Sequence, residues 1–281
     1  MKLTKKLIPA LGMLVLSASM LVTSTFAWFS MNDRVEAKGM TVTAKAEQVY
    51  LQIVNDATAF DNKQAQTSAT ATNSGYTTPD GGGEATPSTF LPITVASGLT
   101  NANKTLTNVT AGENGLLSNA IKWYVNYSND PAAYKNDNNE YSEVTVDTAE
   151  QNLKPYCLIN TFYVRLNPAT NVTTTSSPLR SEIATAFATG DPMAETVSVL
   201  VVCGNYAQLW KQTSLNAWAS TGNALTDGGF ANAGTNNGGH EVKVYIFFDG
   251  ENANCTTNNV KTTNYAVTVN FTVAAKTKFA K

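Results

Sequence analysis

The residues that could carry out chemistry are few, and their spacing fits no common catalytic motif. The one histidine, His240, lies between Gly239 and Glu241 at the start of an apolar run. A zincin needs two imidazoles and a general base in an HExxH sequence, which is absent. No serine lies in a GxSxG sequence, so a serine hydrolase of that type is not indicated. We therefore predict that the chain is not an enzyme, has no catalytic residues, and carries His240 as an exposed loop residue.

The chain has three cysteines, Cys157, Cys203 and Cys255, and this odd number leaves at least one thiol unpaired within the molecule. Cys157 and Cys203 lie in apolar, strand-like runs and are predicted to be buried. A disulfide between them would require neighbouring strands of suitable geometry. Cys255 ends a polar stretch, so we predict that it is exposed. No CxxC and no Cys/His pair at ligand spacing is present, so a zinc site is not expected.

Two segments, 137–140 and 249–254, are rich in side-chain oxygens. Calcium prefers about six to eight oxygen ligands, which such loops can supply, but neither segment has the spacing of an EF-hand. We expect solvated turns there and predict no bound cofactor or metal, with calcium the one ion left open.

The N-terminus has the three parts of a secretion signal. Lys2, Lys5 and Lys6 precede an uncharged apolar stretch, 7–22, and Thr25 and Ala27 supply small residues at positions −3 and −1. We predict a signal peptide over residues 1–27, cut between Ala27 and Trp28. An uncleaved anchor is the alternative, because the apolar stretch is long. The expected location is extracellular or on the cell surface, with membrane contact only before cleavage.

Charge and composition favour a β-rich surface protein. Removing residues 1–27 leaves 16 basic and 21 acidic residues, a net charge of −5. Nucleic acid as a partner would require a clustered basic face, so it is not expected. Charged residues make up only 14% of the chain, and Thr, Asn, Ser and Gly are abundant. That composition suits strands joined by long turns.

The apolar pattern predicts an all-β fold. Residues 40–47 alternate between apolar and polar, 49–54 form a second apolar run, and 121–127 place Ile121, Trp123, Val125 and Tyr127 on one face. Four later strands are expected at 158–166, 196–202, 242–248 and 265–273. Segment 178–189 reads as the one short helix, with Ser177 as N-cap and Leu179, Ile183 and Phe187 on one stripe. Segments 55–89 and 129–140 read as polar loops. We predict a single jelly-roll-type β-sandwich domain over 39–281, with long polar loop insertions.

Residues 22–47 resemble the start of the TasA/camelysin family of secreted fibre proteins, whose signals are processed by a SipW-type peptidase. Segments 155–167, 242–255 and 265–273 look like the middle and closing strands of related proteins from Gram-positive anaerobes. The residues that carry the resemblance at the signal junction and first strand are Thr25, Ala27, Trp28, Phe29, Asn32, Asp33, Gly39, Met40, Val42 and Ala44.

The resemblance implies a subunit of an extracellular or biofilm-matrix fibre that assembles with itself. In such a fibre the segment freed by cleavage, 28–38, adds a strand to the sheet of a neighbouring copy by donor-strand complementation. The candidate donor side chains are Trp28, Phe29, Met31 and Val35. The alternative function is a monomeric cell-surface adhesin or carbohydrate-binding β-sandwich that stacks sugars on exposed aromatic rings. The candidates for that stacking are Tyr50, Trp123, Tyr124, Trp210 and Trp218.

Overall fold

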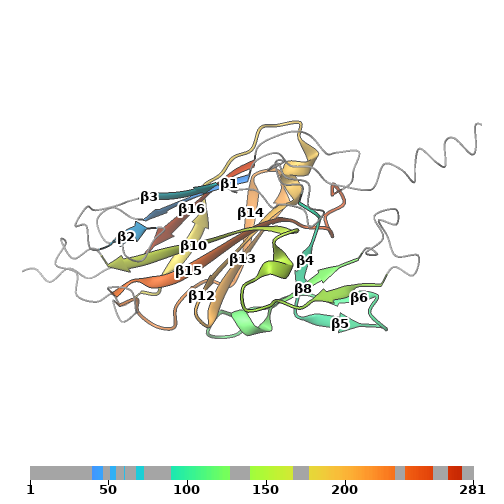
Figure 1. Cartoon of the computed structure of the whole chain (residues 1–281), viewed down its shortest axis with the longest axis horizontal. Helices are drawn as coiled ribbons and strands as arrows, with labels where there is room; N and C mark the ends of the chain where they lie inside the picture. The colour runs from blue at the N-terminus through green and yellow to red at the C-terminus, as the bar shows by residue number, and fades with distance from the viewer. Residues whose placement is uncertain are drawn as a thin grey trace, which may run out of the picture.

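The structure is a computed structural model, and it confirms an all-β fold (Figure 1). Apart from Gly238, helical geometry in the described residues is limited to short 3-10 turns, among them η2 (Ser118–Ala120), η3 (Gln151–Leu153) and η5 (Pro192–Thr196). No helix in this part of the chain is both long and apolar enough to cross a membrane. The structure describes residues 40–46, 51–54, 60, 68–72, 90–126, 140–166, 177–231, 238–255 and 265–273.

The largest sheet has seven strands, all paired antiparallel. Its two central strands are rich in β-branched and aromatic residues, which suits strands that are covered on both faces. Along the sheet the order is β14 (Ala217–Thr221), β13 (Tyr206–Ser214), β12 (Val197–Cys203), β15 (His240–Phe248), β10 (Cys157–Leu166) and β2 (Leu51–Val54), with β7 (Leu116–Leu117) also on β13.

A four-stranded sheet packs on one face of the seven-stranded sheet. Its β1 runs parallel to β16, and its other two pairings are antiparallel. The parallel pair departs from the antiparallel order of a jelly roll, and the jelly-roll connectivity stays a prediction. The strand order is β11 (Arg180–Ile183), β16 (Tyr265–Thr272), β1 (Met40–Ala46) and β3 (Ser68–Thr72).

The main hydrophobic core lies between these two sheets and follows from the period-two pattern of their strands. In β15, Val242, Val244, Ile246 and Phe248 are buried in this core, while Tyr245 and Phe247 point to the opposite face. In β16, alternate residues from Tyr265 to Phe271 are buried, and the ring of Tyr265 lies 5.5 Å from that of Phe248.

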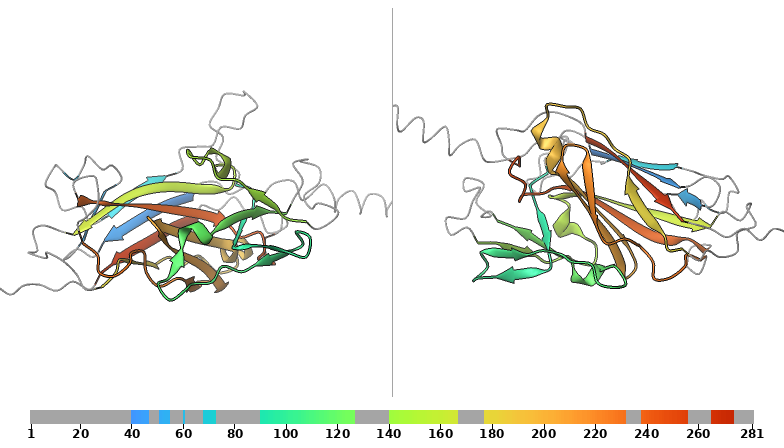
Figure 2. Two further views of the ribbon diagram at one scale, coloured as in Figure 1. Left: turned by 90° about the horizontal axis from the view of Figure 1, so that it is seen from below. Right: turned by 180° about the vertical axis from the view of Figure 1, so that it is seen from behind.

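A third layer covers the other face of the seven-stranded sheet (Figure 2). The indole of Trp123 in β8 lies 5.7 Å from the ring of Tyr245 and 5.1 Å from that of Phe247. β15 is therefore enclosed on both faces. The layer comprises β4 (Thr94–Ala96), β8 (Lys122–Val125), β9 (Ser142–Val144) and the hairpin of β5 (Gly98–Thr100) with β6 (Thr105–Thr107).

The helix predicted over 178–189 is wrong, because Arg180–Ile183 is strand β11. Leu179, Ser181 and Ile183 are buried, and the residues between them are exposed. The predicted stripe was spaced by four residues, a spacing that fits period two as well as a helix. Pairing with β16 supplies the backbone hydrogen bonds that select the strand.

The loop predicted over 55–89 is wrong at Ser68–Thr72, which pairs with β1 as strand β3. Apart from Phe60, the rest of that segment lies outside the described residues. Most of the loop predicted over 129–140 also lies outside them.

Candidate functional site

One edge of the seven-stranded sheet is only partly paired by the strands that the structure describes. Strand β10 has ten residues, but β2 pairs only with its last four, Tyr163 to Leu166. On this edge, no strand of the described part of the chain pairs with residues 157–162. Backbone N–H and C=O groups on such an edge can pair with an added strand.

Arg165 of β10 binds both Gln52 in β2 and Phe60. Its Nε donates to Gln52 Oε1 at 2.8 Å, and its Nη2 donates to the carbonyl oxygen of Phe60 at 3.1 Å. The guanidinium carbon also lies 4.3 Å from the centre of the Phe60 ring. Phe60 is thereby held at the level of Arg165, rather than further along β10 beside residues 157–162.

Asn160 lies in the middle of the uncovered half of β10. It shares a strand face with Leu158 and Phe162, which are buried in the core between the two sheets. Its Nδ2 is buried and has no hydrogen-bond partner among the described residues. An unsatisfied buried donor costs about 1–3 kcal/mol. Because this amide lies on the core-facing side of the sheet, an added strand would reach it with a side-chain acceptor on that face.

The corresponding edge of β11 is closed by Gln208 of the opposite sheet and by the chain at residues 225–226. The backbone N of Leu179 donates to Thr226 Oγ1 at 3.0 Å, and its carbonyl oxygen accepts from Leu225 N at 2.7 Å. The backbone N of Ser181 donates to Gln208 Oε1 at 2.6 Å. Because these groups are satisfied within the chain, this part of β11 is a poor site for strand addition.

The chain enters its first described strand at the end of the sandwich where the uncovered half of β10 begins. Met40 pairs with Tyr265, whose ring contacts Phe248, and Cys157 pairs with Phe247. β1 is held between β16 and β3 over its length. Whatever precedes Met40 is therefore tethered at this end.

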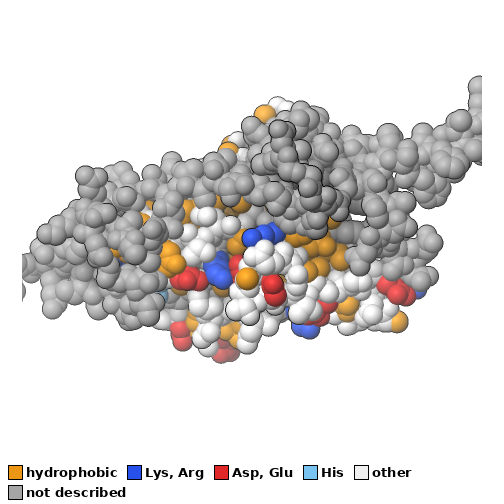
Figure 3. Space-filling model, viewed as in Figure 1, with side chains coloured by type: hydrophobic (Ala, Val, Ile, Leu, Met, Phe, Trp, Pro, Cys, Tyr) orange, Lys and Arg blue, Asp and Glu red, His pale blue; other side chains and the backbone are white. Residues whose placement is uncertain are grey.

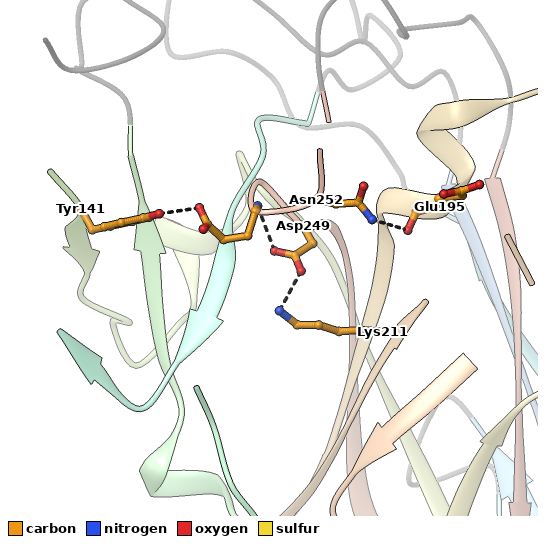
Figure 4. Close-up of polar contacts among 6 residues, drawn as sticks. Tyr141, Glu195, Lys211, Asp249 and Asn252 are labelled. Atoms are coloured by element: carbon orange, nitrogen blue, oxygen red, sulfur yellow. Dashed lines mark hydrogen bonds and ion pairs between the residues drawn. The ribbon is translucent and has the colours of Figure 1, made fainter. Parts of the chain in front are cut away.

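The segment 249–254 also lies at this end, and its polar atoms bind protein groups (Figure 4). Asp249 Oδ2 lies 2.7 Å from Lys211 Nζ, and Glu251 Oε1 accepts from the Tyr141 hydroxyl at 2.7 Å. Asn252 Nδ2 donates to the carbonyl oxygen of Glu195 at 3.1 Å. The segment joins β13, η5 and the chain before β9, so the expected solvated turn is in fact a packed junction.

Metal ligation is not indicated by the described residues, which contain no group of three His, Cys, Asp or Glu side chains that could hold an ion. The oxygen-rich segment 137–140 lies outside them except for Glu140.

The thiols are buried, and the prediction that Cys255 is exposed is wrong. Cys255 is only 6% exposed because its backbone N donates to Asn252 O at 2.8 Å, which turns the chain into the core. Burial of Cys157 and Cys203 is confirmed, and they lie on opposite faces of the sheet, so they cannot form a disulfide. Burial raises the pKa of Cys203 and of Cys255 to about 12, which keeps both thiols neutral and unreactive.

His240 is the first residue of β15 and is half-buried, so its prediction as an exposed loop residue is wrong. Its ring lies 4.8 Å from that of Phe230, and its Nε2 is 2.7 Å from the carbonyl oxygen of Ala231. A carbonyl oxygen can only accept, so Nε2 carries the hydrogen.

The aromatic residues predicted as sugar platforms are packed into the protein. Trp123 and Tyr124 are buried, and Trp210 and Trp218 are half-buried against the main core. The two half-buried indoles donate to Ser181 Oγ and to the Thr185 carbonyl oxygen. Tyr50 lies outside the described residues. On the face shown in Figure 3, the visible acidic and basic side chains are interspersed rather than gathered into one basic patch.

The predicted cleavage site at Ala27 and Trp28 and the donor candidates Trp28, Phe29, Met31 and Val35 all lie outside the described residues. The uncovered edge of β10 was missed by sequence reasoning, because the pattern of a strand does not reveal how much of its edge a partner covers. The one available signal was a polar residue, Asn160, in an apolar run.

Comparisons with protein-family models, with curated proteins and with solved structures find no match for this chain.

Proposed function

We propose that the chain is a secreted structural subunit of an extracellular or biofilm-matrix fibre, in which segment 28–38 of one copy adds a strand to another copy. The proposed acceptor is the uncovered half of β10, residues 157–162, and this edge is the observation that carries the proposal. The unsatisfied Nδ2 of Asn160 beside it gives an added strand a polar group to bind.

The chemistry of the acceptor edge favours addition of a strand. Proteins commonly protect exposed strand edges with charged residues or proline. Residues 157–162 contain neither. The donor segment offers apolar side chains at Trp28, Phe29, Met31 and Val35, which can pack on both faces of the extended sheet.

The length of the donor segment is sufficient for this role. Eleven residues in extended form span about 36 Å at 3.3 Å per residue, against about 20 Å for a six-residue edge. β1 stays paired with β16 and β3 in its own copy, so the segment before it acts as a tethered arm. Cleavage after Ala27 would release that arm from the membrane and so start assembly.

The test is negative-stain electron microscopy of the mature chain, 28–281, at rising concentration, beside a variant that starts at Gly39. We expect filaments from the first and none from the second. Globular monomers or closed pairs from the mature chain would refute the fibre. Filaments from both would show that assembly does not use the N-terminal segment.

A point variant tests the acceptor edge separately. Asn160→Ala removes no hydrogen bond from the described fold, but it removes the donor offered to the added strand. We expect the variant to fold normally and to need a higher concentration to form filaments. The matched control is Asn152→Ala, which loses an exposed hydrogen bond to Thr145 O. Equal filament formation by Asn160→Ala and the control would exclude this role for Asn160.

A further inference from the structure

A lysine, a glutamate and a tyrosine meet on the face of the seven-stranded sheet that the third layer covers. Lys243 and Tyr245 are two residues apart on β15, so their side chains project from the same face. Lys243 Nζ lies 2.7 Å from Glu150 Oε1, and the Tyr245 hydroxyl donates to the same oxygen at 2.9 Å. An amine and a hydroxyl therefore converge on one oxygen of a single carboxyl group.

The backbone around Glu150 fixes its carboxyl group in this place. Glu150 has φ +57° and ψ +22°, in the left-handed region that residues other than glycine seldom adopt. Its backbone N donates to Asp147 O at 2.9 Å, and its carbonyl oxygen accepts from Leu153 N at 3.1 Å. This turn brings the side chain to Lys243, which is 93 residues further along the chain.

The surroundings of these three residues limit the access of water. Tyr245 is 7% exposed, and its ring lies 5.7 Å from the indole of Trp123. The side chains of Glu150 and Lys243 are 17% and 31% exposed. Burial penalises charged groups more than neutral ones, so it favours transfer of a proton from Nζ to Oε1. That transfer gives the free amine, which is the nucleophilic form of lysine.

A second set of the same three residue types, on β8 and β9, provides a comparison within the molecule. Lys122 and Tyr124 are also two residues apart, and both contact Glu143 Oε2. The distances are longer, 3.0 Å from Nζ and 3.4 Å from the hydroxyl. The side chains of Lys122 and Glu143 are 47% and 43% exposed. Water solvates this pair as ions, so we expect an ordinary surface ion pair there.

We propose that Lys243 and Glu150 form an amide bond within the chain, with Tyr245 as proton donor to the departing oxygen. Nζ of the free amine attacks Cδ of the neutral carboxyl group, so the Nζ–Cδ bond forms and the Cδ–Oε1 bond breaks. Oε1 leaves as water with the proton of the Tyr245 hydroxyl, and the phenolate takes a proton from Nζ. One ammonium and one carboxylate thus give one amide and one water, and nothing is oxidised or reduced.

Fixed geometry is what makes this condensation feasible in water. Groups held in contact can react as though their concentration were about 10⁵–10⁸ M. A positioned proton donor adds about 10²–10⁴-fold to the rate. The bond would join the segment before β10 to the central strand β15 within one subunit, and it does not depend on strand donation between copies.

Intact-mass spectrometry of the purified chain 28–281 tests the proposal. We expect a mass that is lower than the mass of the sequence by one water molecule. Because a succinimide at an Asp-Gly sequence would cause the same loss, protease digestion and tandem mass spectrometry must locate the bond. The expected product is one branched peptide that contains both Glu150 and Lys243.

Three variants identify the roles of the residues. Lys243→Arg keeps the positive charge but has no nucleophilic amine, so it should fold and keep the full mass. Lys122→Arg is the matched control and should lose water as the natural chain does. Tyr245→Phe keeps the packed ring without the hydroxyl, and it should lose water about 100-fold more slowly. Unchanged circular dichroism spectra would show that the variants keep the fold.

Two results would overturn the proposal: the full mass in the natural chain, or a loss of water that maps to other residues. Equal rates of water loss in Tyr245→Phe and the natural chain would exclude Tyr245 as the proton donor. None of these results bears on filament formation, which is measured separately.

Discussion

Gln208 in β13 binds Ser181 in β11 and so joins the two sheets of the sandwich through a buried side chain. Its Oε1 accepts from the backbone N of Ser181 at 2.6 Å and from Ser181 Oγ at 3.0 Å. The Ser181 hydroxyl in turn accepts from Trp210 Nε1 at 3.1 Å. Because these atoms are buried, water does not replace the bonds if one partner is removed.

Gln208→Leu should destabilise the fold by about 2–3 kcal/mol, because it leaves the buried N–H of Ser181 without an acceptor. Chemical denaturation followed by tryptophan fluorescence measures the change. Gln151→Leu is the control, since Gln151 is exposed, and it should change stability by less than about 0.5 kcal/mol. Equal effects of the two substitutions would show that the buried bond contributes little.

Gly222 should tolerate no side chain. Its φ is +86°, and a Cβ there would lie 2.6 Å from the carbonyl oxygen of Ala207 and 2.9 Å from Leu116 Cβ. Gly222→Ala combines backbone strain with overpacking and should cost about 3 kcal/mol. Gly204→Ala separates the two causes, because φ is +56° but no atom lies within 4 Å; it should cost about 1 kcal/mol. If the two variants lost similar amounts of unfolding free energy, the steric contribution at Gly222 would be refuted.

The central strands could be predicted from the sequence because their apolar residues are consecutive or strictly alternating. β12, β15 and β16 were all expected within one or two residues of their bounds. In the third layer only β8 was expected, within the strand predicted at 121–127, whereas β4, β5, β6 and β9 were not. β5 and β6 have three residues each, too few for a pattern, and only their mutual pairing makes them strands.

The candidate site could not be predicted in the same way, because it depends on where a neighbouring strand stops. Nothing in the run around Asn160 indicates that β2 pairs only with Tyr163 to Leu166. The position of Cys255 depends on the turn at Asn252, a tertiary detail that its polar neighbours concealed.

The ion pair between Lys211 and Asp249 should matter more than an ion pair on the open surface. The Asp249 side chain is 9% exposed and that of Lys211 is 37% exposed. Lys211→Met would leave a nearly buried carboxylate without its cation and should cost about 1–2 kcal/mol. Lys122→Met is the control, because Lys122 and Glu143 are 47% and 43% exposed, and it should leave the urea midpoint unchanged. A larger loss in the control than in Lys211→Met would contradict this ranking.

The unfolding free energy should fall as the pH rises above the ordinary pKa of a cysteine thiol. Burial raises the pKa of Cys203 and Cys255 to about 12, whereas the pKa of a thiol in the unfolded chain is about 8.5. Below that pH both states keep their protons, so the stabilisation is fully present. Above it the unfolded state loses protons first, and each buried thiol lowers the unfolding free energy by up to about 1.4 kcal/mol per pH unit.

Urea denaturation of the reduced protein between about pH 8 and 10 measures this slope. Cys255→Ala should reduce the slope, because one of the buried thiols no longer titrates in the unfolded chain. The variant's stability at pH 7 changes by the loss of packing alone, so the comparison rests on the slope and not on the absolute value. An identical slope in the variant and the natural chain would mean that the Cys255 thiol ionises as readily in the folded protein as in the unfolded one.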